Sequence, residues 1–242
     1  MSLLMPQPSV IESAVLRCLP ALHLPAGARV LDAPCGAGAL ALKLSEAGFD
    51  AWGLDLVAEA RPFLRGRLLL GDLNRPLPWA DASFHALFSI EGIEHLENRF
   101  SFLREAHRIL RVEGLLVITT PNIVSLRSRL RFLGSGFFHR DSRPLNESER
   151  HPLHHIGLAT FADLRYALHT SGFALLHVSS THVKPVSYLY ALYVPWMWLY
   201  TLIAFRKEKD PAQRKRNRQT RSILFSPDVL FGENLLLIAK KR

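Results

Sequence analysis

Residues 30–44, with the sequence VLDAPCGAGALALKL, decide the fold. An apolar run that ends on Asp32 predicts a short buried strand. A tight turn with Gly36 and Gly38 follows, and a helix-forming run then continues to Gly48. A strand, a glycine turn and a helix in this order form a nucleotide-type binding corner. The glycines lack a Cβ atom, so a ligand can approach the backbone closely, and the helix start presents free N–H groups.

Two kinds of ligand fit this corner. Gly36 and Gly38, with Ala41 three residues later, also match the dinucleotide pattern, and Asp55 lies at about the right separation for a ribose contact. Asp32, however, directly precedes the turn. A carboxylate there would repel a pyrophosphate but attract an ammonium group. The corner therefore favours a ligand that carries a positive charge.

Length, charge and cysteine content limit the class of protein. A chain of 242 residues is long enough for one α/β domain with a full core. The net charge of +9 favours anionic partners, such as nucleic acid, phosphorylated metabolites or an anionic membrane. Cys18 and Cys35 are the two cysteines, far apart in the sequence, which is typical of a reducing compartment. Residues 1–9 show no signal-peptide pattern, and we expect a cytoplasmic location.

Strands and helices alternate along the chain. Strands are expected at 29–32, 51–55, 67–71, 84–90, 115–120, 173–180 and 235–239. Helices are expected at 9–19, 39–47, 57–65, 100–110 and 160–171. This alternation predicts a doubly wound parallel sheet whose ligand lies at the carboxyl edge of the strands. Polar residues follow five of the strands and would line that edge, although single ones could instead cap the next helix. These residues are Asp32, Asp55, Asp72, Glu91 and Asn122.

With these residues the chain resembles the class I S-adenosylmethionine-dependent methyltransferases over about 28–180 and 234–241. The stretches that match are 30–38, Asp55, 71–73, 78–87 and 110–114. The resemblance implies a single Rossmann-like domain over 1–242. Its seven-stranded sheet would have the order 3-2-1-4-5-7-6, with the last strand antiparallel.

The resemblance also implies which residues hold the cofactor. Asp32 and the two glycines would bind its aminoacyl part, Asp55 the ribose hydroxyls and Asp72 the adenine amino group. The full set implied is Asp32, Ala33, Gly36, Gly38, Asp55, Leu56, Asp72, Leu73 and Ser89. Leu56 and Leu73 would contact the faces of the adenine ring.

A metal site is a further hypothesis. Glu91, Glu94 and His95 have the spacing i, i+3, i+4, which places side chains on one face of a helical turn. The motif resembles one in ubiquinone-pathway O-methyltransferases and small-RNA 2′-O-methyltransferases. There, with a later histidine, it binds a divalent cation. The fourth ligand would be His155, with His154 as the alternative, and magnesium, manganese or zinc would fit. Without a metal, His95 could act as a base beside Glu94, or simply pack.

The stretch 188–205, YLYALYVPWMWLYTLIAF, is uncharged and is flanked by basic residues. Its length is at the lower limit for a membrane span. It falls within an insert over 184–232 between the sixth and seventh strands, so both ends of the insert must lie on one side of a membrane. We therefore expect a segment that lies in or dips into one leaflet, with a basic run on anionic headgroups. Pro195 in its middle permits a kink or a helical hairpin. A buried helix, an oligomer contact or a single crossing are the alternatives. A second, lid-like insertion is expected over 121–158.

These features favour a methyltransferase that acts on oxygen. Its acceptor would be an amphiphilic or lipid-linked molecule, and the enzyme would be peripheral or monotopic on the inner face of an anionic membrane. RNA 2′-O-methylation is the first alternative, supported by the net positive charge. A non-catalytic, cofactor-binding scaffold at the membrane is the second.

Overall fold

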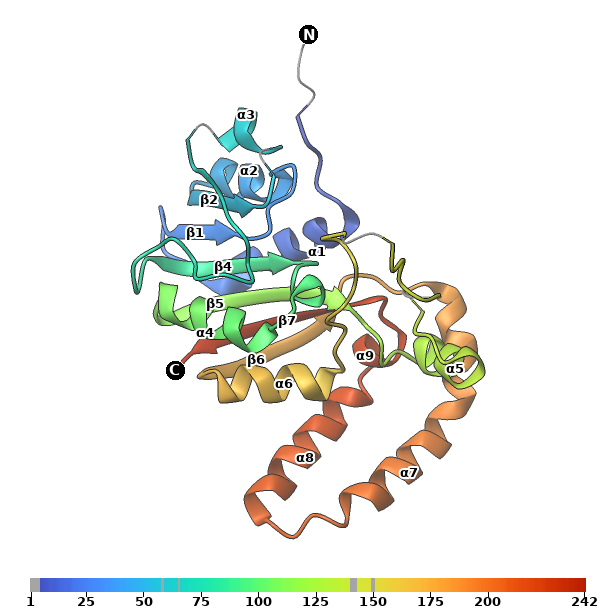
Figure 1. The fold of residues 1–242 in the computed structure, drawn as a ribbon. Coiled ribbons are helices and arrows are strands. Elements are labelled where there is room, and N and C mark those ends of the chain that lie inside the picture. The colour runs from blue at the N-terminus through green and yellow to red at the C-terminus, as the bar shows by residue number, and fades with distance from the viewer. Residues whose placement is uncertain (1–4, 58, 65, 140–142, 149–150) are drawn as a thin grey trace.

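A seven-stranded sheet forms the centre of the molecule in the computed structural model, which describes residues 5–57, 59–64, 66–139, 143–148 and 151–242 (Figure 1). Its strands are β1 Arg29–Asp32, β2 Asp50–Asp55, β3 Leu68–Leu70, β4 Phe84–Ile90, β5 Leu110–Pro121, β6 Phe173–Ser180 and β7 Asn234–Lys241. The order is β3-β2-β1-β4-β5-β7-β6, and β7 is antiparallel to both β5 and β6. The predicted fold class and strand order are confirmed.

Helices cover both faces of the sheet (Figure 1). The α-helices are α1 Val10–Cys18, α2 Ala39–Glu46, α3 Arg61–Leu64, α4 Arg99–Ile109, α5 Leu126–Ser135, α6 Phe161–Thr170, α7 Val194–Phe205, α8 Pro211–Leu224 and α9 Pro227–Phe231. The short 3₁₀ helices are η1 Leu19–Leu22, η2 Ile93–His95 and η3 Pro185–Tyr193. The helix expected at 57–65 is the shorter α3, and residues 58 and 65 lie outside the described residues.

Alternating side chains divide the core into two layers. On β1, Leu31 packs with residues of α4 and α6 on one face, whereas Val30 packs with α1 and α2 on the other. Val30 and Leu31 are both fully buried. Each fully buried aliphatic side chain contributes about 1.5–3 kcal/mol to stability. The two layers hold the carboxyl edge of β1 in place, and this edge carries Asp32.

The insert between β6 and β7 leaves and re-enters the sheet at the same edge. Ser180 at the end of β6 pairs with Leu235 at the start of β7, and Asn234 pairs with Pro121 at the end of β5. The insert runs through η3, α7 and α8 and projects from the domain (Figure 1). A single crossing of a membrane would remove β7 from the sheet, so the docked strand argues against it.

The lid-like insertion expected over 121–158 contains α5, and its residues 140–142 and 149–150 lie outside the described residues. Asn122, at its start, has a structural partner. Its Nδ2 donates hydrogen bonds to the carbonyl oxygens of Val229 and Gly232, both at 2.9 Å. Asn122 therefore holds α9 against the end of β5.

Candidate active site

The glycine turn after β1 has the conformation that the sequence predicts. Gly38 has φ +83°, and a Cβ atom there would lie 2.8 Å from the Cβ of Ala60, so this position requires glycine. Gly36 has φ +49°, and a Cβ atom there would meet nothing within 4 Å. The Gly36 N–H donates to Asp55 Oδ2 at 2.7 Å. The turn is thus fixed to β2 while its outer side stays open to a ligand.

Asp32 is a buried carboxylate at the base of this turn. Its side chain accepts a hydrogen bond from the Ala41 N–H at 3.2 Å, and the residue is only 2% exposed. Burial raises the pKa of Asp32 well above its usual range, and the negative charges of Glu12 and Asp55 add to the effect. A ligand with a positive charge near Asp32 would stabilise its ionised form.

A cleft of about 740 Å³ brings four of the predicted cofactor residues together. Its lining includes Asp55, Leu56, Asp72 and Leu73 together with His95. Leu56 is 53% exposed, as expected of an apolar side chain that a flat ring would cover. The cleft therefore joins the predicted adenine and ribose contacts to the predicted catalytic histidine.

Two predicted cofactor residues lie deeper. Ala33 is fully buried directly after β1. Ser89 on β4 is also fully buried, and its Oγ has no hydrogen-bond partner within the described residues. A Cβ atom at Gly92 would lie 2.4 Å from Pro34 Cδ and 3.1 Å from this Oγ. An unsatisfied hydroxyl beside a close backbone approach fits a site that binds a polar ligand.

Glu94, His95 and His155 form a compact cluster, with one ligand atom from each within 4.8 Å of the others. Glu94 is fully buried in η2, and the rings of His95 and His155 lie 4.9 Å apart. His95 Nδ1 is 3.1 Å from the carbonyl oxygen of His154. Because a carbonyl oxygen only accepts, Nδ1 carries a proton, and in the neutral ring the lone pair is then on Nε2. His154 thus orients His95 through its backbone.

Glu91 makes different contacts from the rest of its predicted group. Its φ is +49°. Thr119 Oγ1 donates to Glu91 Oε1 at 3.0 Å, and Asn234 Nδ2 donates to Oε2 at 2.7 Å. The structure therefore groups three of the four predicted metal ligands and binds the Glu91 carboxylate to β5 and β7. Sequence analysis missed Thr119 and Asn234, although both lie at the sheet edge that it predicted.

Comparison with known proteins identifies the domain. Residues 31–118 match the family described as "Methyltransferase domain". Over this part, about a third of its length, the chain is similar to a methyltransferase domain. The predicted resemblance to S-adenosylmethionine-dependent methyltransferases is confirmed by this match and by the relatives that follow.

The domain has relatives with curated names. The chain is 32% identical over 107 residues to a probable S-adenosylmethionine-dependent methyltransferase of Mycolicibacterium smegmatis, covering 43% of this chain and 42% of that protein. It is 28% identical over 133 residues to the 27-O-demethylrifamycin SV methyltransferase of Amycolatopsis mediterranei, covering 48% and 49%. The matched part of the chain thus spans slightly less than half the length of these relatives.

The fold of the domain also occurs in solved structures. A putative methyltransferase from Bacillus halodurans superposes with a TM-score of 0.57 at 20% identity, covering 95% of this chain and 99% of that one. At this identity the similarity concerns the fold alone.

Proposed function

We propose that this chain transfers the methyl group of S-adenosylmethionine to an oxygen atom of a hydrophobic acceptor at an anionic membrane surface. The observation that carries the proposal is the cleft that joins Asp55, Leu56, Asp72 and Leu73 to His95. An O-methyltransferase among the relatives supports oxygen as the methylated atom.

Three groups on the chain would hold the cofactor. Asp32 would face the ammonium of its aminoacyl part, beside the open turn at Gly36. Asp55 would accept from the ribose hydroxyls, since its carboxylate already lies at the turn. Asp72 uses Oδ1 for both bonds to Asn74, and Oδ2 would accept from the adenine amino group. The cofactor supplies a methyl group on a positively charged sulfur, which is why a buried carboxylate fits this corner.

His95 would remove the proton from the acceptor hydroxyl. In the neutral ring its Nε2 would carry the lone pair, and the His154 carbonyl holds the ring in one orientation. General base catalysis of this kind contributes about 10²–10⁴-fold to the rate. A divalent metal is the alternative at the same place, because a carboxylate and two imidazoles form a donor set found in catalytic zinc sites. Magnesium and manganese also take such ligands, and any of these metals would lower the pKa of a bound hydroxyl.

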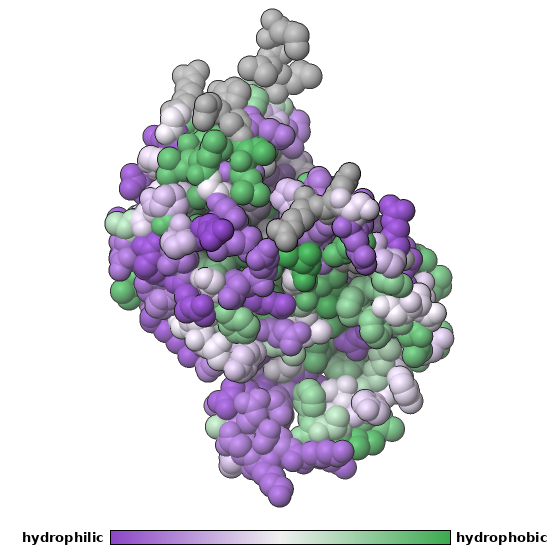
Figure 2. Space-filling model, in the orientation of Figure 1, coloured by the Kyte–Doolittle hydropathy of each residue, from purple (hydrophilic) through white to green (hydrophobic). Residues whose placement is uncertain are grey.

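The insert supports a membrane surface. Pro185–Phe205 is the one helical segment in the described part of the chain that is long and apolar enough to span a membrane, and within it only Ser187 is buried. Trp196 is 66% exposed and Leu199 is 52% exposed. An apolar surface of this kind indicates a membrane or protein contact, and α7 borders the strongly basic α8 (Figure 2). An in-plane position in the inner leaflet fits both features.

The proposal is tested by incubating the protein with methyl-labelled cofactor and either a lipid extract or an RNA preparation. Label in the lipid fraction that is lost in His95→Ala supports the proposal. Label in RNA alone would replace it with 2′-O-methylation, and no label with intact cofactor binding would favour a scaffold.

The proposed membrane contact is tested by flotation with vesicles of phosphatidylcholine and phosphatidylglycerol. Trp196→Ser with Leu199→Ser should lose binding, whereas the control Val10→Ser with Val112→Ser, which also removes exposed apolar side chains, should keep it.

A further inference from the structure

A second cleft, of about 870 Å³, lies between α6, β6 and α8. It shares no lining residue with the candidate active site. Its lining includes Arg165, Arg216 and Arg242 but no aspartate or glutamate. We call it the arginine cleft. Three guanidinium groups without a carboxylate in the lining make this a positively charged site.

Two of these arginines bind neutral acceptors. Arg165 Nη2 donates to Gln219 Oε1 at 2.9 Å, which links α6 to α8. Arg242 Nη2 lies 2.9 Å from His169 Nδ1, and because the guanidinium only donates, this nitrogen is the acceptor. These bonds fix the positions of both side chains. They leave the positive charges uncompensated, since an amide oxygen and a neutral imidazole carry no net charge.

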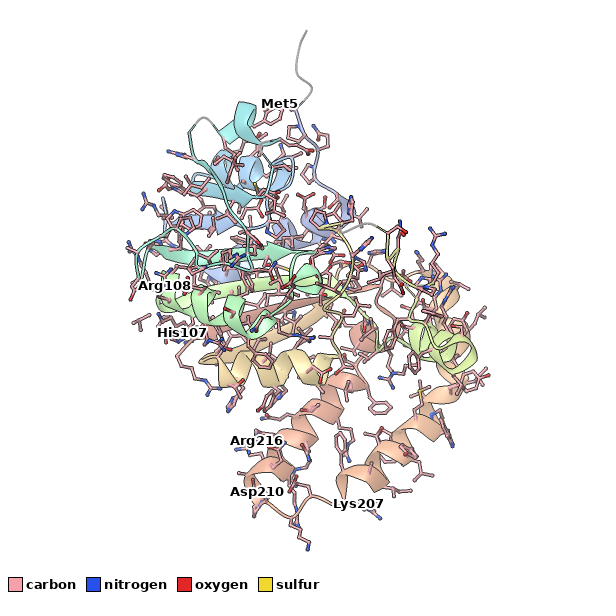
Figure 3. All side chains as sticks on the ribbon, viewed as in Figure 1. Met5, His107, Arg108, Lys207, Asp210 and Arg216 are labelled. Carbon is pink, nitrogen blue, oxygen red and sulfur yellow. The ribbon has the colours of Figure 1, made fainter. Side chains whose placement is uncertain are left out.

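Arg216, the third arginine, also bonds a neutral acceptor but has one carboxylate nearby. Arg216 Nε donates to Gln213 Oε1 at 2.7 Å. Its Nη2 is 3.7 Å from Asp210 Oδ2, and both residues lie on α8 or at its start (Figure 3). Asp210 also accepts from two backbone N–H groups of the first turn of α8. The carboxylate nearest to Arg216 is therefore already engaged as a helix cap.

The pKa shifts in the cleft agree with an excess of positive charge. Burial lowers the pKa of Arg165, and the charge of Arg216 lowers it further. Burial also lowers the pKa of His169, followed by the charges of Arg242, Arg216 and Arg165. An anion in the cleft would reverse these charge effects. Guanidinium groups bind phosphate through paired, charge-assisted hydrogen bonds.

The arginine cleft is continuous with the apolar insert. Phe205, the last residue of α7, is part of its lining. Arg221 of α8 lies over the ring of Trp198 of α7, with its guanidinium carbon 5.9 Å from the ring centroid. Hydrophobic residues gather over α7 directly beside the hydrophilic surface of α8 (Figure 2). A molecule with apolar chains on α7 and a phosphate in the cleft would match both surfaces.

We propose that the arginine cleft binds the phosphate of an anionic phospholipid headgroup. The phosphate would lie between Arg165 on α6 and Arg216 on α8, with Arg242 at the end of β7 as the third donor. This rests on the membrane contact in the proposed function and adds a defined headgroup site to it. It would fix the orientation of the domain, and therefore of the methyl-transfer cleft, above the bilayer.

The test is flotation of the full chain with phosphatidylcholine vesicles that contain phosphatidylglycerol, at 150 mM salt and without cofactor. Arg165→Gln with Arg216→Gln should bind about 10- to 100-fold more weakly, the change expected when one or two charge-assisted hydrogen bonds are lost. The matched control is Lys215→Gln with Arg218→Gln. It removes the same charge from exposed positions on α8 that do not line the cleft. Its loss of binding should be clearly smaller than that of the cleft variant, because an exposed charge near the surface contributes about 1 kcal/mol or less and is partly screened at this salt.

The outcomes separate the possible sources of the anion. Equal loss in the two double variants would overturn the site and leave general electrostatic attraction. Loss of single-stranded RNA binding in the cleft variant, with vesicle binding unchanged, would overturn the lipid in favour of nucleic acid. Protection of the free protein against thermal unfolding by soluble glycerol phosphate, lost in the cleft variant, would support the phosphate site but assign it to a soluble ligand. None of these binding assays uses the methyl donor. Their results would therefore stand even if the proposed methyl transfer failed.

Discussion

Asp32→Asn should have opposite effects on cofactor binding and on stability. The substitution keeps the size of the side chain and an oxygen that can accept from the Ala41 N–H. It removes the negative charge, which burial and the charges of Glu12 and Asp55 destabilise in the free protein. The variant should therefore be more stable than the wild type at neutral pH. It should nevertheless bind the cofactor more weakly.

The magnitude for the cofactor follows from the burial of Asp32. Removing one member of a buried ion pair costs about 3–5 kcal/mol, because the other charge is left without compensation. The lower end applies where the opposite charge lies on a ligand in an open cleft. A loss of about 3 kcal/mol raises the dissociation constant about 150-fold.

The gain in stability of the Asp32→Asn variant depends on pH. Folding raises the pKa of Asp32. In the wild type this carboxyl is therefore protonated at low pH, and above its folded-state pKa it is ionised and its buried charge lowers stability. The advantage of the variant should therefore grow from pH 4 upwards.

Two measurements check this prediction. Titration calorimetry with S-adenosylhomocysteine, the demethylated product, gives the dissociation constants of both proteins at pH 7.5. Chemical denaturation between pH 4 and pH 8 gives the free energies of unfolding. A dissociation constant within about 3-fold of the wild type would refute the assignment of Asp32 to the ammonium. A stability difference that stays constant with pH would refute the raised pKa.

Further predictions concern the turn, the base and the metal. Gly38→Ala should destabilise the domain by about 2 kcal/mol in chemical denaturation, because the backbone has positive φ and the new Cβ would clash with Ala60. The control Gly136→Ala has positive φ but open space and should cost less. His95→Ala should reduce methyl transfer at least 100-fold and leave the calorimetric affinity for the cofactor product within about 2-fold. If Glu94, His95 and His155 hold a metal, a chelator should abolish turnover and elemental analysis should find about one equivalent.

Local sequence predicted the parts of the site that depend on neighbouring residues. The turn at Gly36 and Gly38 follows from backbone freedom and from the strand before it. Asp55 and Asp72 could be placed at one edge because parallel strands end together. The structure brings both into one cleft with His95. The positions of Asp55 and Asp72 at strand ends were therefore enough to predict that they lie in one site, although they are far apart in the sequence.

The contacts of Glu91 could not be predicted in this way. The Asn234 amide that binds it comes from a strand 143 residues later in the chain. Thr119 lies on β5, which pairs with β4 through Ile90. A spacing of i, i+3, i+4 assumes one continuous helical turn. The left-handed backbone at Glu91 instead places it before η2, whose helical residues begin at Ile93. Periodicity alone could not reveal this break.

The position of β7 links the insert to the candidate catalytic residues. Glu233, just before β7, lies 3.3 Å from Arg127 of α5 and 3.1 Å from Lys184 at the start of η3. The next residue, Asn234, binds Glu91. Because Glu91 leads directly into η2, the base of the insert and the turn that carries His95 share one hydrogen-bonded network. A membrane-bound insert would therefore act on the same sheet edge at which the acceptor must meet the methyl donor.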